Sequence, residues 1–279
     1  MSLCSLTMKA SIFLTLSLML AAAPCMANSA PTEVRVGGYQ FAPFVEISPE
    51  GEASGLTLEL IEALNLVQNR YHFVFVPTKP AQRYKEFEAN RFDMLLFENK
   101  TWGWNNYAIN SSSPYLSGGE RYIAQALPGR GQDYFDNLQD KRLVGIRGYH
   151  YRFANFNADP NYLHEQFTIN LIDSNAGSIR MVLSGRVDVA VVTQSYLFQQ
   201  LASQPELQSQ LLISEKFDQR YQHCALIRAG TRPAPSELDN FIKRLQAQGT
   251  LDALWQKYGL MKKPEASLQN AAQEPDRDG

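Results

Sequence analysis

The sequence SGRVDVAVV at residues 184–192 has the pattern of a β-strand that is covered on both faces. Its last six residues are apolar except for Asp188, which is typical of a strand inside a parallel sheet. Residues 175–184, directly before it, have apolar side chains at helical spacing. A helix followed by a buried strand is one unit of an α/β fold.

The same helix–strand pattern occurs once more, earlier in the chain. Residues 81–90 predict a helix and residues 92–97 an apolar strand. In both copies a turn and an acidic residue, Asp93 or Asp188, stand at the start of the apolar run. The repetition predicts two similar lobes. Because α/β folds bind ligands outside the carboxyl ends of their parallel strands, the loops after both strands are candidate ligand sites.

The rest of the chain alternates in the same way between short apolar strands and amphipathic helices. The predicted strands span residues 34–38, 71–76, 121–127, 142–146 and 167–171, with a further strand-like run at 223–227. The predicted helices span residues 56–68, 151–156, 196–201, 235–248 and 250–258. This alternation predicts an α/β fold with mostly parallel sheets.

The composition excludes several classes of protein. The 279 residues contain 26 Lys and Arg against 28 Asp and Glu, a net charge of -2. This balance argues against a protein that binds nucleic acid through a broad basic surface, so we expect no nucleic-acid partner. With 44% apolar and 11% aromatic residues, the chain is neither disordered nor fibrous.

Residues 1–27 have the layout of a secretory signal peptide. Lys9 precedes an apolar run over residues 10–23, and small residues follow it up to Ala27 or Ala30, the two candidate cleavage sites. The alternative is a membrane anchor, but the run is shorter than the roughly 20 residues that span a bilayer. We therefore predict export to the periplasm.

Cleavage of the signal would leave one cysteine. Cys4 and Cys25 would be removed, and Cys224 alone cannot form an internal disulfide. Its apolar neighbours predict a buried thiol rather than a nucleophile. The polar residues 264–279 predict a flexible tail.

Several short segments, in order, resemble one known family. They are residues 34–44 with the loop FAPF, GLTLEL at 55–60, SPY at 113–115, and residues 138–148, 185–191 and 248–259. Together they resemble the bacterial periplasmic solute-binding proteins of the amino-acid-binding type, solute-binding protein family 3. The resemblance covers about residues 33–259.

This resemblance implies a type II periplasmic-binding-protein fold with two lobes. Each lobe would be a mostly parallel sheet flanked by helices, with the ligand in the cleft between lobes that close by a hinge motion. Lobe 1 would contain residues 31–118 and 220–263, and lobe 2 residues 119–219. The hinge strands would pass near residues 117–119 and 219–223.

The resemblance also implies the partners. We expect a monomer without cofactor that captures a small polar solute, amine-bearing or aromatic, and docks to the membrane permease of an ABC-type importer. The alternatives are a sensor that docks to a membrane receptor or signalling enzyme, and an enzyme on the same fold. No Gly-x-Ser-x-Gly, His-Glu-x-x-His or phosphate-loop motif is present in the sequence, which favours binding over catalysis.

The sequence departs from the family at two charged positions. The family's loop after the first-lobe strand carries an Arg for the ligand carboxylate, whereas residues 97–105 read FENKTWGWN. The family's ammonium-binding Asp is replaced by Thr193-Gln194. Both charge anchors of an α-amino-acid site are therefore missing, and we do not expect a standard α-amino-acid ligand.

Aromatic residues and one carboxylate are the candidates for the first lobe's side of the cleft. They are Tyr39, Phe41, Phe44, Glu98, Trp102 and Trp104. A carboxylate beside aromatic faces suits a cationic or amine-bearing ligand, and flat aromatic ligands or sugars would also stack there. The alternative is that the tryptophans pack the lobe and Glu98 is a solvated loop residue.

In the second lobe, the candidates open the helix predicted at residues 151–156. Arg147, Tyr149 and Tyr151 stand at its start, where a helix N-terminus favours an acidic group, and Thr193 directly follows the strand that ends at residue 192. Arg147 opposite Glu98 would make the site bipolar; otherwise it is an exposed charge at a strand end. The four histidines show no paired spacing, so we expect no metal site.

Overall fold

The computed structural model describes residues 30–260, so the predicted signal peptide (1–27) and tail (264–279) lie outside the described residues. Between residues 30 and 260, no helix has both the length and the apolar character needed to cross a membrane.

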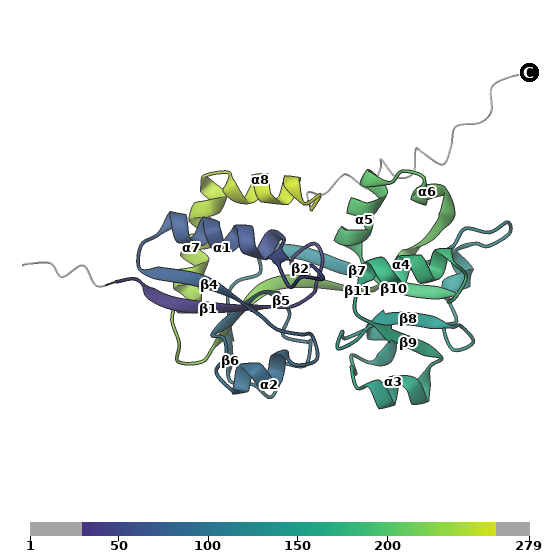
Figure 1. Cartoon of the computed structure of the whole chain (residues 1–279), viewed down its shortest axis with the longest axis horizontal. Coiled ribbons are helices and arrows are strands. Elements are labelled where there is room, and N and C mark those ends of the chain that lie inside the picture. The colour runs from purple at the N-terminus through teal and green to yellow at the C-terminus, as the bar shows by residue number, and fades with distance from the viewer. Residues whose placement is uncertain (1–29, 261–279) are drawn as a thin grey trace, which may run out of the picture. The chain divides into compact units, whose positions relative to one another are not determined.

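A nine-stranded sheet contains two blocks of parallel strands (Figure 1). In the first block, β1 (Thr32–Gly38) pairs in parallel with β4 (Tyr71–Pro77) and β5 (Met94–Glu98). In the second block, β8 (Leu143–Ile146) pairs in parallel with β9 (Ile169–Ile172) and β10 (Val189–Thr193). The predicted α/β fold is confirmed, but parallel pairing is confined to these two blocks, and the other four pairings of the sheet are antiparallel.

Two long antiparallel strands join the blocks. β7 (Leu116–Gln125) pairs with β10, β11 (Leu211–Arg228) pairs with β5, and the two strands pair with each other. Gly118 lies opposite Tyr221, and Glu120 lies opposite Gln219, so the segments predicted as hinge are direct neighbours. The lobe boundaries at residues 118 and 220 stay predictions.

Gly118 allows this pairing because the rings opposite approach the backbone closely. A Cβ atom at this position would lie 2.3 Å from the Tyr221 ring and 2.9 Å from Nε2 of His223. Glycine in a strand often marks such a close approach.

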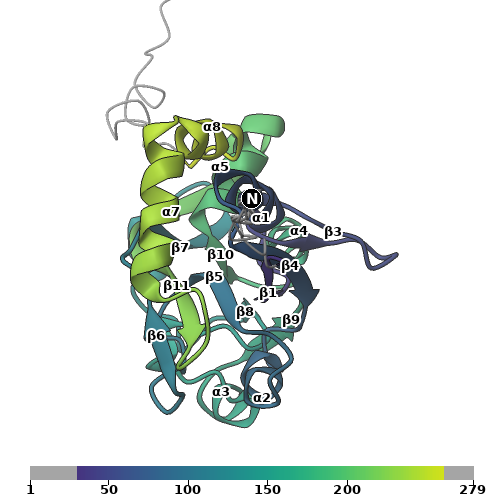
Figure 2. The same cartoon turned by 90° about the vertical axis from the view of Figure 1, so that its left-hand side faces the viewer.

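Helices cover both faces of the sheet (Figures 1 and 2). α1 (Leu56–Val67), α7 (Pro235–Ala247) and α8 (Thr250–Lys257) pack together beside the first block. α4 (Asn175–Leu183) and α5 (Gln194–Ser203) pack on strands β10 and β7 of the second half. α4 begins where the Ser174 hydroxyl accepts a hydrogen bond from the Gly177 amide, a typical N-cap.

The remaining elements are short. They are β2 (Glu46–Ile47), β3 (Ala53–Ser54), α2 (Arg83–Glu88), β6 (Ile109–Ser111), α3 (Pro160–Gln166), α6 (Leu207–Gln210) and 3₁₀ helices at Gln132–Phe135 and Arg152–Ala154.

One prediction of local structure was wrong, and another was correct but too short. The helix predicted at residues 151–156 is one 3₁₀ turn, because Asn155 and Phe156 adopt left-handed backbone angles, with φ of 53° and 59°. The strand predicted at residues 223–227 is only the end of β11, which begins at Leu211. Its first part is rich in polar residues and hides the strand pattern. Cys224 is a buried free thiol, as predicted.

Candidate functional site

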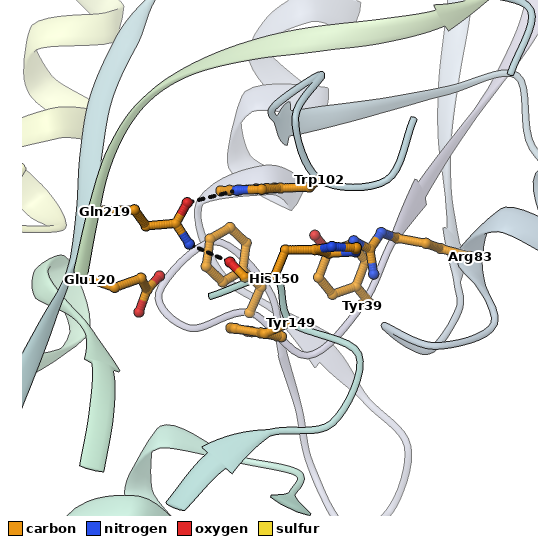
Figure 3. A pocket seen from close by; sticks show the side chains of 8 residues that line it. Tyr39, Arg83, Trp102, Glu120, Tyr149, His150 and Gln219 are labelled. Atoms are coloured by element: carbon orange, nitrogen blue, oxygen red, sulfur yellow. Dashed lines mark hydrogen bonds between the residues drawn. The ribbon is translucent and has the colours of Figure 1, made fainter. Parts of the chain in front are cut away.

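A small cavity lies among the carboxyl ends of strands from both parallel blocks (Figure 3). Its lining comes from the loops after β1, β5 and β8, from the start of α2, and from β7 and β11. The lining residues are Tyr39, Phe41, Arg83, Trp102, Glu120, Tyr149, His150 and Gln219. This is the place where an α/β fold is expected to bind a ligand.

Aromatic rings form the walls of the cavity. Trp102 and Tyr149 lie on opposite sides of it (Figure 3). The Phe41 ring is almost perpendicular to both, with centroids 5.9 Å from Trp102 and 5.6 Å from Tyr149. Trp102 Nε1 donates to Oε1 of Gln219 at 3.2 Å, and the Tyr149 hydroxyl donates to the Gln40 carbonyl at 3.0 Å. These bonds hold the rings so that a flat or cationic group can lie against them.

Arg83, a residue the sequence analysis missed, is buried at one end of the cavity, with only 1% of its surface exposed. Its Nε lies 3.3 Å from Oε1 of Glu98, and its Nη1 donates to the Gly148 carbonyl at 3.1 Å. The guanidinium also lies over the Tyr39 ring, 4.9 Å from its centroid. Arg83 is therefore a buried cation whose partners come from several segments of the chain.

Glu98 is the counter-ion of Arg83, and it does not line the cavity. The Tyr39 hydroxyl donates to its Oε1 at 2.7 Å, and Trp104 Nε1 donates to its Oε2 at 3.1 Å. Burial raises the pKa of Glu98, while Arg83 and these two donors act in the opposite direction. Both carboxylate oxygens are thus engaged by the protein, and the alternative of a solvated loop residue is wrong.

Glu120 on β7 is a second buried carboxyl group, and it does line the cavity. Its Oε1 accepts hydrogen bonds from the Tyr221 hydroxyl at 3.0 Å and from the Thr193 hydroxyl at 3.3 Å. Its Oε2 is buried and has no hydrogen-bond partner within residues 30–260. Burial raises the pKa of Glu120 to about 8, and Asp218 adds to this effect. One oxygen of this group therefore has no hydrogen-bond donor among the described residues.

Contacts across the cavity join the loop after β8 to the first half of the chain. His150 Nε2 lies 2.7 Å from the Tyr84 hydroxyl, and its Nδ1 lies 2.6 Å from the Phe156 carbonyl, to which it donates. Gln219 Nε2 donates to the His150 carbonyl. Burial and the nearby Arg83 lower the pKa of His150 to about 4, so its ring is neutral at pH 7. The structure thus has the two sides in contact over the cavity.

The structure brings four of the predicted site residues together at the cavity, and these are Tyr39, Phe41, Trp102 and Tyr149. The other six do not line it. Three of them pack or bond inside the protein: the Phe44 ring packs against Phe97, Trp104 Nε1 donates to Glu98, and the Tyr151 hydroxyl accepts a hydrogen bond from the Ile146 amide.

The two predicted residues that remain, besides Glu98, have different surroundings. Thr193 is buried and bonds to Asn175 and Glu120, beside the cavity rather than in its lining. The Arg147 side chain is about half exposed, 3.9 Å from the exposed Asp173, and it bonds to the Leu171 carbonyl. These surroundings favour the alternative that Arg147 is an exposed charge at a strand end rather than a ligand contact.

Four lining residues were missed by sequence reasoning, and these are Arg83, Glu120, His150 and Gln219. Glu120 had a usable signal, since it stands between two glycines and the strand predicted at residues 121–127. Arg83 looks like any exposed charge of an amphipathic helix. Between residues 30 and 260, no cluster of three or more His, Cys, Asp or Glu side chains has the arrangement of a metal site.

Comparison with known proteins places this geometry in context. The model of the family described as bacterial extracellular solute-binding proteins, family 3, matches residues 34–261. A search of curated proteins finds no match.

Three solved structures illustrate the similarity of fold. A putative ABC-transporter binding component from Wolinella succinogenes, complexed with lysine, is 17% identical with a TM-score of 0.64, covering 84% of this chain and 98% of its own. The GluR0 ligand-binding core with L-glutamate is 15% identical, with a TM-score of 0.63 and coverages of 82% and 99%. The ancestral amino-acid-binding protein AncCDT-1, a precursor of cyclohexadienyl dehydratase, is 20% identical, with a TM-score of 0.62 and coverages of 81% and 95%. All three share the predicted type II fold.

Proposed function

Since the chain belongs to family 3 of the bacterial extracellular solute-binding proteins, we propose that it captures a small polar solute in the periplasm and delivers it to an ABC-type importer. The solute bears an amine or an aromatic ring. The observation that carries this proposal is the cavity walled by Trp102, Tyr149, Phe41 and Tyr39, with a carboxyl group at its edge.

Contacts across the cavity support capture by closure. Arg83 donates to the Gly148 carbonyl, Tyr84 bonds to His150, and Tyr149 bonds to the Gln40 carbonyl. A solute that touches both sides stabilises the closed state by its differential affinity for that state. This closure would distinguish loaded from empty protein for a permease.

Two observations bear on the alternatives. The GluR0 ligand-binding core has the same fold, which favours a sensor as the second candidate. AncCDT-1 is a binding protein that preceded an enzyme, so the fold can also support catalysis. We favour binding without turnover, because protein partners hold the buried ionisable groups at the cavity. The exceptions are one oxygen of Glu120 and Nε of Arg83, which has no hydrogen bond within the described residues but lies 3.3 Å from Oε1 of Glu98.

A thermal-shift screen tests capture directly. Histamine, choline, tyramine, L-histidine, L-tyrosine and glycine betaine, each at millimolar concentration, serve as probes. We expect at least one to raise the Tm, because a solute that binds only the folded protein stabilises it. If none does, capture of an amine or aromatic solute is wrong.

The Trp102→Leu variant tests the aromatic wall. We expect it to weaken binding of the active probe by about 1–2 kcal/mol, the scale of a desolvated cation–π contact, measured by calorimetry. Trp255→Leu is the matched control, since Trp255 is also buried but lies in α8 outside the lining. Equal losses in both variants would mean that the effect comes from folding and would remove Trp102 from the site.

Uptake separates import from sensing. Cells that lack the gene should take up the labelled probe more slowly than cells that carry it. Unchanged uptake, together with a lost transcriptional response to the probe, would favour the sensor.

A further inference from the structure

We propose that Glu120 holds the positively charged nitrogen of the solute, and that this solute is a monocation without a carboxylate. The classes that fit are a primary amine, a guanidine or a methylated ammonium. This inference rests on the proposed function and names the substrate class of the same cavity.

The first argument is the unpaired oxygen of Glu120. Oε1 is held by Tyr221 of β11 and Thr193 of β10, whereas the buried Oε2 has no hydrogen-bond partner within the described residues. Buried polar atoms are almost always hydrogen-bonded, so an exception calls for an explanation. The carboxyl group lies at the cavity, close to Gln219 and Tyr149 (Figure 3). A solute nitrogen there would satisfy Oε2.

The second argument is the charge of the cavity. Arg83 and, once it is deprotonated, Glu120 are its charged lining residues, since His150 is neutral. Arg83 is already compensated by Glu98, and its Nη1 also donates to the carbonyls of Pro80 and Gly148. Glu120 has no such cation, and one monocation would make the closed cavity neutral. A zwitterion would bring a second carboxylate for which this lining offers no free cation.

Other groups around Glu120 do not neutralise it. Asp218 of β11 is an acid, and it raises the pKa of Glu120. Its own oxygens accept hydrogen bonds from the Tyr122 hydroxyl and from two backbone amides. Tyr221, Thr193 and Tyr149 are uncharged at pH 7. Because none of these neighbours carries a positive charge and the pKa of Glu120 is raised, Glu120 is largely protonated at pH 7 in the empty protein. A bound cation would displace that proton.

The third argument is the aromatic lining. Rings of Trp102, Tyr149 and Phe41 surround the space beside the carboxyl group. Aromatic faces attract cations, most strongly when the cation is desolvated, and cages of this composition suit amines and methylated ammonium groups.

The experiment uses matched pairs of probes that share a cation and differ by a carboxylate. The pairs are choline and glycine betaine, histamine and L-histidine, and tyramine and L-tyrosine, measured by thermal shift and calorimetry at pH 8.5. We expect a cationic member to bind at least tenfold more tightly than its zwitterionic mate. Equal or tighter binding of the zwitterions would overturn the monocation assignment while leaving solute capture intact.

Glu120→Gln removes the charge and keeps the size of the side chain. We expect it to weaken binding of the cationic probe at least tenfold, whereas Glu215→Gln, the same change at an exposed position, leaves binding unaltered. Unchanged affinity in Glu120→Gln would overturn the role of Glu120.

The proton balance provides a readout that a purely structural role would not change. Below pH 8 a bound cation releases a proton from Glu120, so the measured binding enthalpy should depend on the ionisation enthalpy of the buffer. Affinity should also rise with pH up to about pH 8 and then level off. Both effects should vanish in Glu120→Gln, and a wild-type enthalpy that is independent of the buffer would contradict the proposal.

A stability measurement tests the role of Glu120 without any probe. An anchor kept unpaired for a ligand destabilises the empty protein, so Glu120→Gln should have an equal or higher Tm than wild type at pH 9. A lower Tm would show that the carboxylate serves the fold and would overturn the inference.

Discussion

Replacing Glu98 with alanine is expected to lower the free energy of unfolding by about 3–5 kcal/mol, as breaking a buried ion pair does. The substitution leaves the Arg83 guanidinium buried, 1% exposed, without its counter-ion. The Tyr39 hydroxyl and Trp104 Nε1 lose their acceptor as well. Urea unfolding at pH 7.5 measures the effect.

A control variant and a double variant show whether that loss of stability comes from the broken ion pair. Glu59→Ala removes the partner of Lys257 in an exposed pair 2.9 Å apart and should cost less than about 1 kcal/mol. Combining Glu98→Leu with Arg83→Leu removes both buried charges and should recover much of the loss, because an apolar replacement of a buried pair is often tolerated. A cost below about 1 kcal/mol for Glu98→Ala would contradict its assignment as the counter-ion.

Acidification is expected to destabilise the wild type relative to a His223→Gln variant by about 1.4 kcal/mol per pH unit below pH 6.5. Burial lowers the pKa of His223 to about 3, while an unfolded histidine titrates near 6.5. The unfolded chain therefore binds the proton first as the pH falls. The contribution of the neutral His223 ring to the free energy of unfolding is complete above pH 6.5 and is lost progressively toward pH 3.

The surroundings of His223 explain this pKa. The ring packs among Phe44, Trp102 and Tyr221, and this burial lowers its pKa. The hydrogen bond that Nδ1 donates to the Phe97 carbonyl at 2.9 Å acts in the opposite direction. Urea unfolding of both proteins between pH 4.5 and 7.5 gives the difference in stability. His164→Gln, at an exposed position, is the control. If the free energies of unfolding of wild type and His223→Gln changed in parallel with pH, the ring would be protonated in the folded protein as readily as in the unfolded chain.

Elements with strong local patterns could be predicted from the sequence. β10, α4 and α1 follow from apolar runs or helical spacing within a few turns of chain. β11 could not, because residues 214–222 mix exposed and buried side chains, and the buried ones, several of them polar, become buried only through tertiary packing along β7. The 3₁₀ turn at Arg152–Ala154 depends on two left-handed residues that the spacing does not reveal.

The aromatic part of the candidate site could also be predicted. Tyr39, Phe41, Trp102 and Tyr149 stand directly after strands β1, β5 and β8, and ligands gather at the carboxyl ends of such strands. Their positions after these strands were enough to predict that they lie at the same cavity.

The sequence by itself determined the α/β class, the family and the aromatic loops, because these depend on local patterns and their order along the chain. The tertiary structure decided which acid is free. Glu98 and Glu120 are both buried carboxyl groups, but Arg83 folds onto the first and no cation lies against the second in the cavity lining. The physical reason is that the state of a buried charge depends on its neighbours in space, which come from distant segments of the chain.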